Sequence, residues 1–396
     1  MKLHCTTCDR LPNESELLAY LCDTCGKELE LPIPSAAGTS LAAHVKRERG
    51  PVWRYGALLP VAYKPVLDDD MPTIATRSRA LEERSGAAEV WLINATTLGT
   101  GTFKDYEAAV VAAMTWELGV SGVSVHSTGN TALAYLHYMS RVGVSCAGYI
   151  PTKNLVKVGP YKSTEDFPLI AVDAEYALLS ATAKNDATKT GRVHLAPLRW
   201  KLEGKAALGL AIQEYCPQVE VIVQTVAGGY GPLGCEVAFR RLRAVGETAG
   251  VAVRRRYALY QAGDSANLAR AWSSGAANLA ANDLRLPDDP FEPTLQSTNP
   301  LATLPRLRAA LPQSSTITAV SPNLVEDSAE LAVDILADLG IPIDYEREKS
   351  AVISIAGVLA SRWSATDRLA IVVSGSARFP DAGSATVART IGGHQV

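Results

Sequence analysis

No stretch of the 396-residue sequence is apolar over the roughly 20 consecutive residues that a membrane-spanning helix needs. Positive charge is not in excess either, since the formal net charge is −3. A chain with this balance has no overall electrostatic attraction to nucleic acid or to an anionic membrane. A secretory signal is also missing from the sequence. We therefore expect a cytoplasmic protein that binds neither nucleic acid nor a membrane.

Two nucleotide-binding signatures are absent from the glycine-rich segment that follows the apolar run 219–226. It lacks the Gly-Lys-Ser/Thr ending of a nucleotidase phosphate loop and the full Gly-x-Gly-x-x-Gly spacing of a dinucleotide site. The segment consists of Ala227, Gly228, Gly229, Tyr230 and Gly231. Its glycines free the backbone to point N–H groups at an anion without a basic side chain. A tight turn that binds nothing is the alternative.

Lys104 follows a Gly-Thr-Phe turn after the apolar run 90–94 and opens a helix-like stretch. A cation in the first turn of a helix faces the positive end of the backbone dipole, which is unfavourable. A lysine in this position therefore calls for a reason. One reason is that its pKa is lowered, because a neutral lysine amine is a nucleophile that forms Schiff bases with carbonyl compounds. An ordinary surface lysine is the alternative.

A second polar turn follows the strand-like run 123–125 and precedes another helix-like stretch. It is built from small hydroxyl and amide residues, namely Ser127, Thr128, Gly129, Asn130 and Thr131. Such a turn offers several hydrogen-bond donors at a helix N-terminus, where a carboxylate binds well. A plain capped turn between a strand and a helix is the alternative.

Short β-branched runs alternate with Ala-rich, helix-like stretches along most of the chain. This alternation predicts an α/β protein with layered, largely parallel sheets. The candidate strands are 90–94, 123–127, 145–150, 169–172, 219–226, 257–261, 316–320 and 369–374, and the candidate helices are 104–118, 131–142, 174–184, 205–215 and 323–339. Active sites in such folds gather at the carboxyl ends of the strands. The lysine, the two turns and Ser374 all stand at or beyond such ends, so we expect them to meet in one cleft.

Two Cys-x-x-Cys pairs stand near the start of the sequence, at Cys5, Cys8, Cys22 and Cys25. Each pair places two thiolates on one turn, and two such turns can close a tetrahedral four-sulfur shell around zinc. A filled shell implies a structural zinc, because a catalytic zinc keeps an open position. Disulfides are the alternative. The segment lacks the clustered cations that binding to a nucleic-acid backbone requires.

In this order, the Gly-Thr-Phe-Lys-Asp turn, the Ser-Thr-Gly-Asn-Thr turn and the glycine-rich segment resemble the pyridoxal-phosphate enzymes of the tryptophan synthase β-subunit fold. Within them, the chain resembles threonine synthase and cysteate synthase. The resemblance covers most of the chain, including Trp53-Arg54-Tyr55 and Asn299-Pro300, and some of these relatives begin with a zinc ribbon. The Gly-Leu-Lys-Asp motif that usually ends the C-terminal signature of threonine synthases is replaced here by residues 377–380. This departure favours a specialised β-replacement enzyme over threonine synthesis.

The resemblance implies roles for the cofactor-binding residues. Lys104 would carry pyridoxal phosphate as an internal imine and later act as the base at Cα of the substrate. Asn130 would meet the hydroxyl of the pyridine ring, and residues 227–231 would hold the cofactor phosphate. Ser374, with Ser376 in reserve, would supply a hydroxyl to the pyridine nitrogen.

The resemblance also implies where the substrate binds. Its carboxylate would meet the second polar turn, residues 127–131. The candidates for binding a substrate phosphate are Arg199, Lys205, Lys153 and Lys157, each of which has an ordinary surface role as its alternative. We expect a small-molecule amino-acid substrate that is O-phosphorylated, and we expect the protein to form a homodimer.

The resemblance implies a pyridoxal-phosphate enzyme that performs β- or γ-elimination and replacement on an O-phosphorylated amino acid. Phosphate would leave and a nucleophile would add to an α,β-unsaturated imine, with water as the nucleophile in a threonine synthase and sulfite in a cysteate synthase. Threonine synthase proper, a dehydratase or β-lyase and a racemase of the same fold are alternatives. A non-catalytic binding protein built around the zinc ribbon is another.

The fold that the resemblance implies has two layered α/β subdomains with largely parallel sheets, preceded by the zinc ribbon. We expect the ribbon over residues 1–30. The larger, cofactor-binding domain is expected over 50–104 and 187–396, and the smaller domain over 105–186.

Overall fold

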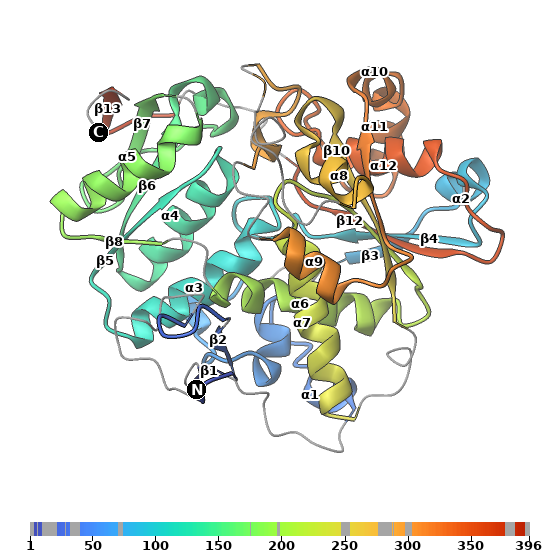
Figure 1. Cartoon of the computed structure of the whole chain (residues 1–396), viewed down its shortest axis with the longest axis horizontal. Coiled ribbons are helices and arrows are strands. Elements are labelled where there is room, and N and C mark those ends of the chain that lie inside the picture. The colour runs from blue at the N-terminus through green and yellow to red at the C-terminus, as the bar shows by residue number, and fades with distance from the viewer. Residues whose placement is uncertain are drawn as a thin grey trace.

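The computed structural model describes residues 4–5, 7–9, 22–27, 29–31, 40–69, 74–174, 176–195, 199–246, 254–275, 287, 289–297, 303–376 and 385–392. Two sheets with their helices lie side by side in the molecule (Figure 1). All but one of the strand pairs within these two sheets are parallel, which confirms the predicted fold class. Asn299, Pro300 and residues 377–380 lie outside the described part of the chain.

The larger sheet has six strands in the order β11-β10-β9-β12-β4-β3. Their bounds are Thr316–Val320, Arg256–Ala262, Val221–Thr225, Arg368–Val373, Glu89–Asn94 and Ile74–Arg77. The edge strand β3 pairs antiparallel with β4. Helices pack on both faces, so the central strands are apolar on both sides. One face is covered by α2 (Arg79–Ser85), α10 (Pro322–Asp327), α11 (Ala329–Asp338) and α12 (Ser350–Ala360).

The opposite face of the larger sheet packs in the main core of the molecule. The helices there are α6 (Arg199–Tyr215), α7 (Tyr230–Ala244), α8 (Asn267–Ser273) and α9 (Leu304–Ala310). Between the two sheets this core continues into α3 (Lys104–Glu117), which packs on α6 and on α4 (Asn130–Val142). The two sheets therefore share one continuous apolar core.

The smaller sheet has five parallel strands in the order β13-β7-β6-β5-β8. Their bounds are Arg389–Gly392, Leu169–Asp173, Ser145–Pro151, Gly122–His126 and Val193–His194. Helix α5 (Tyr176–Lys189) covers one face, and Figure 1 shows α4 and α5 around this sheet on the left. Because β8 and β13 join this sheet, it extends beyond residues 105–186. The division into subdomains that we expect from the sequence stays a proposal.

Each of the eight predicted strands overlaps an observed strand, and the predicted and observed bounds differ by at most two residues. The helix expected over 205–215 begins earlier, at Arg199. The helix expected over 323–339 is divided at Ser328, whose hydroxyl donates to the Leu324 carbonyl at 2.8 Å and so competes with the backbone ladder. Helices α2, α7, α8, α9 and α12 were not among those expected.

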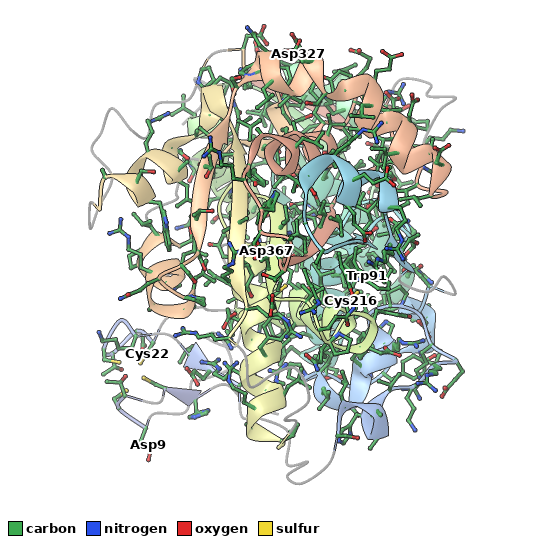
Figure 2. The ribbon with its side chains drawn as sticks, turned by 90° about the vertical axis from the view of Figure 1, so that its right-hand side faces the viewer. Asp9, Cys22, Trp91, Cys216, Asp327 and Asp367 are labelled. Atoms are coloured by element: carbon green, nitrogen blue, oxygen red, sulfur yellow. The ribbon has the colours of Figure 1, made fainter. Side chains whose placement is uncertain are left out.

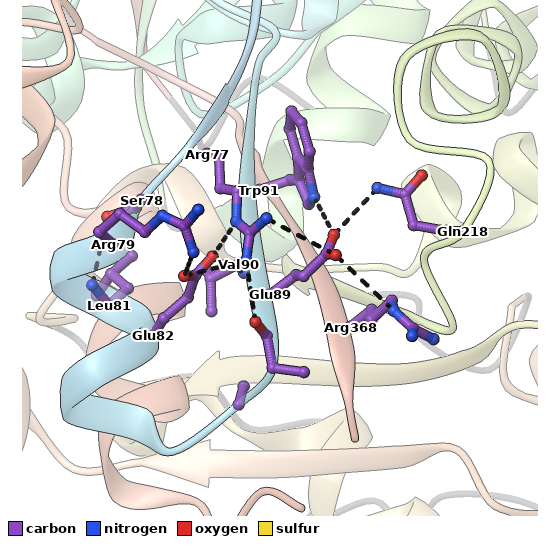
Figure 3. A network of polar contacts seen from close by, with 12 residues as sticks. Arg77, Ser78, Arg79, Leu81, Glu82, Glu89, Val90, Trp91, Gln218 and Arg368 are labelled. Carbon is purple, nitrogen blue, oxygen red and sulfur yellow. Dashed lines mark hydrogen bonds and ion pairs between the residues drawn. The ribbon is translucent and has the colours of Figure 1, made fainter. Parts of the chain in front are cut away.

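Charged side chains gather at the amino ends of the strands of the larger sheet (Figure 3). Glu82 accepts hydrogen bonds from Arg77 and Arg79 and from the backbone N–H of Val90. Glu89 lies 3.7 Å from Arg77 and 3.9 Å from Arg368. These carboxylates connect β3, α2, β4 and β12 at one edge of the sheet. The carboxyl ends of the parallel strands lie at the opposite edge, outside this network, and remain free for a binding site.

A small module lies at one end of the molecule, where Figure 2 shows Cys22 and Asp9 far from Asp327. Strands β1 (His4–Cys5) and β2 (Leu29–Glu30) pair antiparallel in it. The short helix α1 (Leu41–His44) follows it along the chain. Short 3₁₀ turns complete the described elements at Trp53–Leu58, Pro65–Leu67, Thr152–Lys157, Gly263–Ser265 and Pro293–Leu295. Among the described residues, no helix has the length and apolar character needed to cross a membrane.

Candidate active site at the carboxyl ends of the strands

One pocket brings together the lysine, part of the second polar turn, the glycine-rich segment and the serine near the end of the chain. The residues that line it are Phe103, Lys104, Asn130, Gln224, Thr225, Val226, Ala227, Gly228, Gly229, Tyr230, Gly231, Thr294, Leu295, Glu348, Ser350 and Ser374. Most of them come from the carboxyl ends of β4, β9 and β12 and the turns that follow, and from the N-terminus of α4. The 3₁₀ turn Pro293–Leu295 and the start of α12 supply the others. The predicted convergence in a single cleft is therefore present in the structure.

Lys104 is the first residue of α3 and turns its side chain into this pocket. Its turn is attached to the end of β12, because the backbone N–H of Phe103 donates to the Ser374 carbonyl at 2.9 Å. Burial lowers the pKa of Lys104 to about 8, while the nearby carboxylate of Glu348 acts in the opposite direction. An amine with this pKa is neutral in a substantial fraction of molecules near neutral pH.

The turn before Lys104 is held by Asp105, which is fully buried. Its carboxylate accepts hydrogen bonds from the backbone N–H and the hydroxyl of Thr100, at 2.8 and 2.6 Å. Burial nevertheless raises the pKa of Asp105 to about 7. The aspartate of the Gly-Thr-Phe-Lys-Asp motif thus shapes the turn and does not line the pocket.

The glycine-rich segment forms the N-terminus of α7. Gly229 has a φ of 82°, a conformation that side chains other than glycine rarely adopt. A Cβ on Gly231 would lie 2.5 Å from the side-chain amide of Gln224, so the backbone and this amide are in close contact. Both amide atoms of Gln224 are buried and have no hydrogen-bond partner among the described residues. A phosphate at this helix N-terminus would accept a hydrogen bond from the amide nitrogen of Gln224, so the segment fits the predicted anion.

Ser374 and Ser376, the two candidates for the pyridine nitrogen, are placed differently. Ser374 lines the pocket, and its hydroxyl donates to the Ser350 hydroxyl at 3.0 Å. Ser376 is not among the pocket residues, and its hydroxyl donates to the Gly101 carbonyl at 3.3 Å. The geometry therefore favours Ser374. Ser350 is a partner that sequence reasoning missed, because it starts helix α12, which was not expected.

Asn130 reaches the pocket from the smaller sheet, and its side-chain amide donates to Glu348 at 2.9 Å. Glu348 is 3% exposed, and burial together with the neighbouring Glu292 raises its pKa. Neither carboxylate was predicted from the sequence. Both come from polar segments without a motif, so only the fold shows that they approach the pocket.

The other residues of the second polar turn are used to build the turn itself. The Ser127 hydroxyl accepts hydrogen bonds from the N–H groups of Gly129 and Ala132, at 3.1 and 2.9 Å. The Thr128 hydroxyl donates to the Thr294 carbonyl at 3.0 Å. Among residues 127–131, only Asn130 lines the pocket. A role of Ser127, Thr128, Gly129 and Thr131 in binding a substrate carboxylate stays a prediction.

The four basic residues expected to bind a substrate phosphate do not line this pocket. Arg199 is 3% exposed and donates from Nε to Glu203 at 3.1 Å. Lys205 forms a buried ion pair with Glu107. The Lys157 amine donates to two backbone carbonyls, those of Glu346 and Arg347. Lys153 is exposed and lines a separate cavity beside Asp173.

Lys201 is a residue that sequence reasoning missed. It lies on α6, and its amine is 5.7 Å from the centre of the Tyr135 ring on α4. Burial, and next the charge of Lys104, lower its pKa to about 8. Among the described residues, it forms no ion pair with a carboxylate. No local pattern in the sequence marks this lysine, because packing between distant segments brings it beside Tyr135 and toward Lys104.

A pair of stacked histidines lies near Lys201, with His126 Nδ1 3.0 Å from His194 Nε2. The Ser124 hydroxyl is 2.8 Å from His194 Nδ1. Burial lowers the pKa of His126 to about 3 and that of His194 to about 4, and the charge of Lys201 acts in the same direction on both. Both imidazoles are therefore neutral near neutral pH, so Lys201 supplies the positive charge of this group.

The four N-terminal cysteines form a compact sulfur cluster, with all Sγ atoms within 4.8 Å of one another. The Cys5 and Cys25 sulfurs are 3.4 Å apart, and those of Cys8 and Cys22 are 3.7 Å apart. Zinc bound to four thiolates at about 2.3 Å would separate them by about 3.8 Å in a tetrahedron. None of the four is in a disulfide. The arrangement and the chemistry of these donors fit zinc.

Comparison with protein families identifies residues 66–298 as matching the family described as pyridoxal-phosphate dependent enzyme. A threonine synthase of Methanosarcina acetivorans is 28% identical over 149 residues, which is 38% of this chain and 36% of that protein. The threonine synthase of Methanocaldococcus jannaschii is 33% identical over 156 residues, 38% of each chain. A cysteate synthase of Methanoregula boonei is 28% identical over 149 residues, 36% of this chain and 35% of that protein. The matches thus span well under half of each relative.

Solved structures share the fold at low sequence identity. A pyridoxal 5'-phosphate-dependent aspartate racemase superposes with a TM-score of 0.59 and 16% identity, covering 78% of this chain and 92% of the other. A fungal L-serine ammonia-lyase from Rhizomucor miehei gives a TM-score of 0.59 and 13% identity, covering 77% and 93%. At these identities the likeness concerns the fold alone.

Proposed function

Because the chain belongs to the pyridoxal-phosphate dependent enzyme family, we propose that it removes phosphate from an O-phosphorylated amino acid and adds a nucleophile in its place. The observation that carries this proposal is the position of Lys201. A lysine without a carboxylate partner among the described residues stands close enough to Lys104 for their charges to interact. An anionic leaving group beside the reacting lysine would use that positive charge.

Pyridoxal phosphate, when bound, supplies an electron sink for the charge that develops at Cα of an amino acid. The residues that would hold it are Lys104, Asn130, Ser374 and the glycine-rich segment 227–231. The Ser374 hydroxyl would bond the ring nitrogen and is itself oriented by Ser350. A neutral hydroxyl supports a protonated ring nitrogen less than a carboxylate would, which favours loss of a leaving group.

Lys104 would also move the proton. Its pKa of about 8 lies close to neutral pH, which suits a group that must accept a proton from Cα and return it later. Glu348 accepts a hydrogen bond of 2.9 Å from the side-chain amide of Asn130 and so holds Asn130 in place. When Glu348 is protonated, it places no negative charge near the substrate. Asn130 in turn would orient the cofactor ring.

The leaving phosphate would lie on the α6 side of Lys104. There Lys201 supplies a charge, and the neutral imidazoles of His126 and His194 supply hydrogen-bonding groups. Charge-assisted hydrogen bonds to an oxyanion are stronger than neutral ones, so Lys201 is the principal group in this arrangement. Arg199 donates to Glu203 and does not line the pocket, and its role in binding the substrate stays a prediction.

The four-cysteine module would bind one structural zinc. None of the described residues of this module lines the Lys104 pocket, and we assign the metal no part in the reaction. The expected homodimer stays a prediction, which sedimentation velocity of the purified protein would test.

The first experiment tests the cofactor. The purified protein should be yellow, and borohydride reduction followed by peptide mapping should place the label on the peptide that contains Lys104. The Lys104→Ala variant should take up no label and serves as the control. A colourless wild-type protein that binds no added pyridoxal phosphate would end the catalytic proposal and leave the non-catalytic alternative.

The second experiment tests the leaving group. Phosphoserine, phosphothreonine and phosphohomoserine are each incubated with the enzyme, with and without sulfite, sulfide or an amine, and released phosphate is measured. We expect phosphate from one of these substrates. Release of ammonia and a keto acid from an unphosphorylated amino acid, without phosphate release from any of the three, would instead support the dehydratase alternative. Conversion of an amino acid into its other enantiomer would support the racemase alternative.

A further inference from the structure

Glu348 is a buried carboxyl group that lines the Lys104 pocket and stands two residues before Ser350, where α12 begins. Its Oε1 accepts a hydrogen bond from the backbone N–H of Ser350 at 3.1 Å. Such a contact caps a helix, because the first N–H groups of a helix have no partner within it. Capping alone does not explain this residue, since a hydroxyl or an amide would cap the helix without the cost of burying a carboxyl group.

The second carboxyl oxygen of Glu348 bonds to a different part of the molecule. Oε2 accepts the 2.9 Å hydrogen bond from the side-chain amide of Asn130, the first residue of α4. Helix α4 packs on the smaller sheet, whereas α12 packs on the larger one. One carboxyl group therefore joins polar groups that come from the two sheets and meet in one pocket.

The same carboxyl group lies against the backbone that follows Ser374. A Cβ on Gly375 would lie 2.6 Å from the carboxyl carbon of Glu348 and 2.7 Å from its Oε2. A side chain at this position would displace the carboxyl group, because buried atoms are already closely packed. The end of β12 and Glu348 are thus in direct contact.

A chain of hydroxyl groups connects Glu348 to the residue expected to meet the pyridine nitrogen. The Ser374 hydroxyl donates to the Ser350 hydroxyl at 3.0 Å. Burial, and next the neighbouring Glu292, raise the pKa of Glu348, and hydrogen bonds from the side chain and the backbone of Ser350 lower it. A hydroxyl has one proton to donate and two lone pairs. Because Ser374 gives its proton to Ser350, its oxygen is left as a hydrogen-bond acceptor in the pocket.

We propose that Glu348 is a positioning residue that orients both polar groups expected to face the cofactor ring. Through Ser350 it keeps the Ser374 oxygen an acceptor, which suits a ring nitrogen that carries a proton. Through its other oxygen it fixes the amide of Asn130. This inference rests on the part of the proposed function that places pyridoxal phosphate in this pocket, and it does not depend on the leaving group.

Glu348→Gln tests the proposal, because glutamine has the same shape but replaces one of the two acceptor oxygens with a donor. We expect the Kd for pyridoxal phosphate, measured by titration of the cofactor-free protein, to rise by about tenfold, since a buried donor loses its partner. The absorbance maximum of the bound cofactor should also shift, because the hydrogen bonds to its ring change.

Glu82→Gln is the matched control. Glu82 is also a buried carboxylate that accepts from a backbone N–H, that of Val90, but it lies at the amino ends of the strands and does not line the pocket. This variant should change the Kd by less than about twofold, as expected for a distant site, and should leave the absorbance maximum unchanged. Circular dichroism checks that each variant is folded.

Ser350→Ala tests the hydroxyl chain by itself, because it removes the hydroxyl and keeps the backbone N–H that bonds Glu348. It should shift the absorbance maximum in the same direction as Glu348→Gln. The double variant should shift it no further than Glu348→Gln alone, since the chain is already interrupted. If Glu348→Gln does not fold, Ser350→Ala decides the question by its spectrum.

Three results would overturn the proposal. Spectra of Glu348→Gln and Ser350→Ala that equal the wild-type spectrum would overturn it and leave the proposed function standing. Additive shifts in the double variant would show that the two residues act separately, and so would also reject it. A wild-type protein that binds no pyridoxal phosphate would overturn this proposal and the proposed function together.

Discussion

At the scale of single residues, the chemistry of the candidate site depends on an amine whose pKa differs from that of a free lysine. Burial lowers the pKa of Lys104 to about 8. Only the neutral amine can attack an aldehyde, and the protonated form has no lone pair for this purpose. The protonation state of Lys104 should therefore control how fast the protein without cofactor takes up pyridoxal phosphate.

We predict that the rate of cofactor uptake rises with pH, reaches half of its maximum near pH 8, where half of the Lys104 amines are neutral, and levels off above that pH. An ordinary lysine, with a pKa of about 10.4, would still show a rising rate at that pH. The measurement is stopped-flow absorbance after mixing the cofactor-free protein with pyridoxal phosphate. A small lysine analogue in solution is the control. A midpoint of the protein's profile near that of the analogue would show that burial does not lower the pKa.

Lys201 allows a second test at this scale. We expect Lys201→Met to lower kcat/KM for the phosphorylated substrate by about tenfold to a hundredfold, because a charged partner of the phosphate is lost. Lys201→Arg keeps the charge and should lower kcat/KM for this substrate by a smaller factor. The visible spectrum of the bound cofactor should not change in either variant, since Lys201 does not line the cofactor pocket. Equal losses in the two variants would argue against a role of the charge.

The residues differ in how far the sequence alone could predict them. Lys104, Asn130 and the glycines stand in short motifs that immediately follow strands, and the structure brings these motifs to one pocket. Arg199 was predicted as a candidate for binding a substrate phosphate, and the structure shows that it donates to the buried Glu203 on the same helix. Lys201 and Glu348 are brought to the site by packing between distant segments. No local pattern marks such residues.

At the scale of elements, strands were easier to predict than helices. The buried parallel strands are short runs of β-branched residues, and each of the predicted strands was found. Helix α12 was missed because Val352, Ile353, Ile355 and Val358 give it the composition of a strand. It packs on β9, β10 and β12 within an apolar core, and this tertiary packing outweighs its local preference.

The glycine-rich turn provides a prediction at this scale. Gly229→Ala should destabilise the protein in two ways, through a φ of 82° and through a Cβ placed 2.6 Å from Leu307. Gly143→Ala is the matched control, because its φ is 69° and a Cβ there would meet nothing within 4 Å. Urea unfolding should show a loss of about 1 to 2 kcal/mol for the control and a larger loss for Gly229→Ala.

The same two variants distinguish an effect on the stability of the protein from an effect on its binding of pyridoxal phosphate. Gly229→Ala should also weaken the binding of pyridoxal phosphate, measured by titration of the cofactor-free protein, because the added methyl group shifts the helix N-terminus that would hold its phosphate. Gly143→Ala lies at the end of α4 and should bind the cofactor normally. If both variants bound the cofactor equally well, the glycine-rich segment would not be its phosphate site.

At the scale of the whole molecule, the arrangement of the two sheets could not be derived from local patterns. Strand β12 is near the end of the chain and yet inserts between β9 and β4, and β13 crosses to the smaller sheet. Alternation of strands and helices predicts parallel pairing but does not give the order of the strands. The site depends on this order, because the insertion of β12 beside β4 places Ser374 next to the turn of Lys104.

The N-terminal module provides the last prediction, which concerns how one part of the molecule supports another. Cys5, Cys22, Leu29 and Leu31 belong to the main apolar core, although the part of their module that the structure describes does not line the Lys104 pocket. The module should therefore affect stability more than chemistry. We expect about one zinc per chain, and we expect the Cys8→Ser variant to lose it, because the four-thiolate shell is then incomplete.

Loss of zinc should lower the temperature of thermal unfolding while the visible spectrum of the bound cofactor is retained at room temperature. Cys216→Ala is the control, since Cys216 is buried in the main apolar core and lies outside the four-cysteine cluster. It should keep its zinc even though removing a buried thiol costs some stability. Metal analysis, thermal unfolding and absorbance are measured on the same preparations. If Cys8→Ser retained zinc, another set of ligands would have to bind it, and if its cofactor spectrum changed, the module would be coupled to the pocket after all.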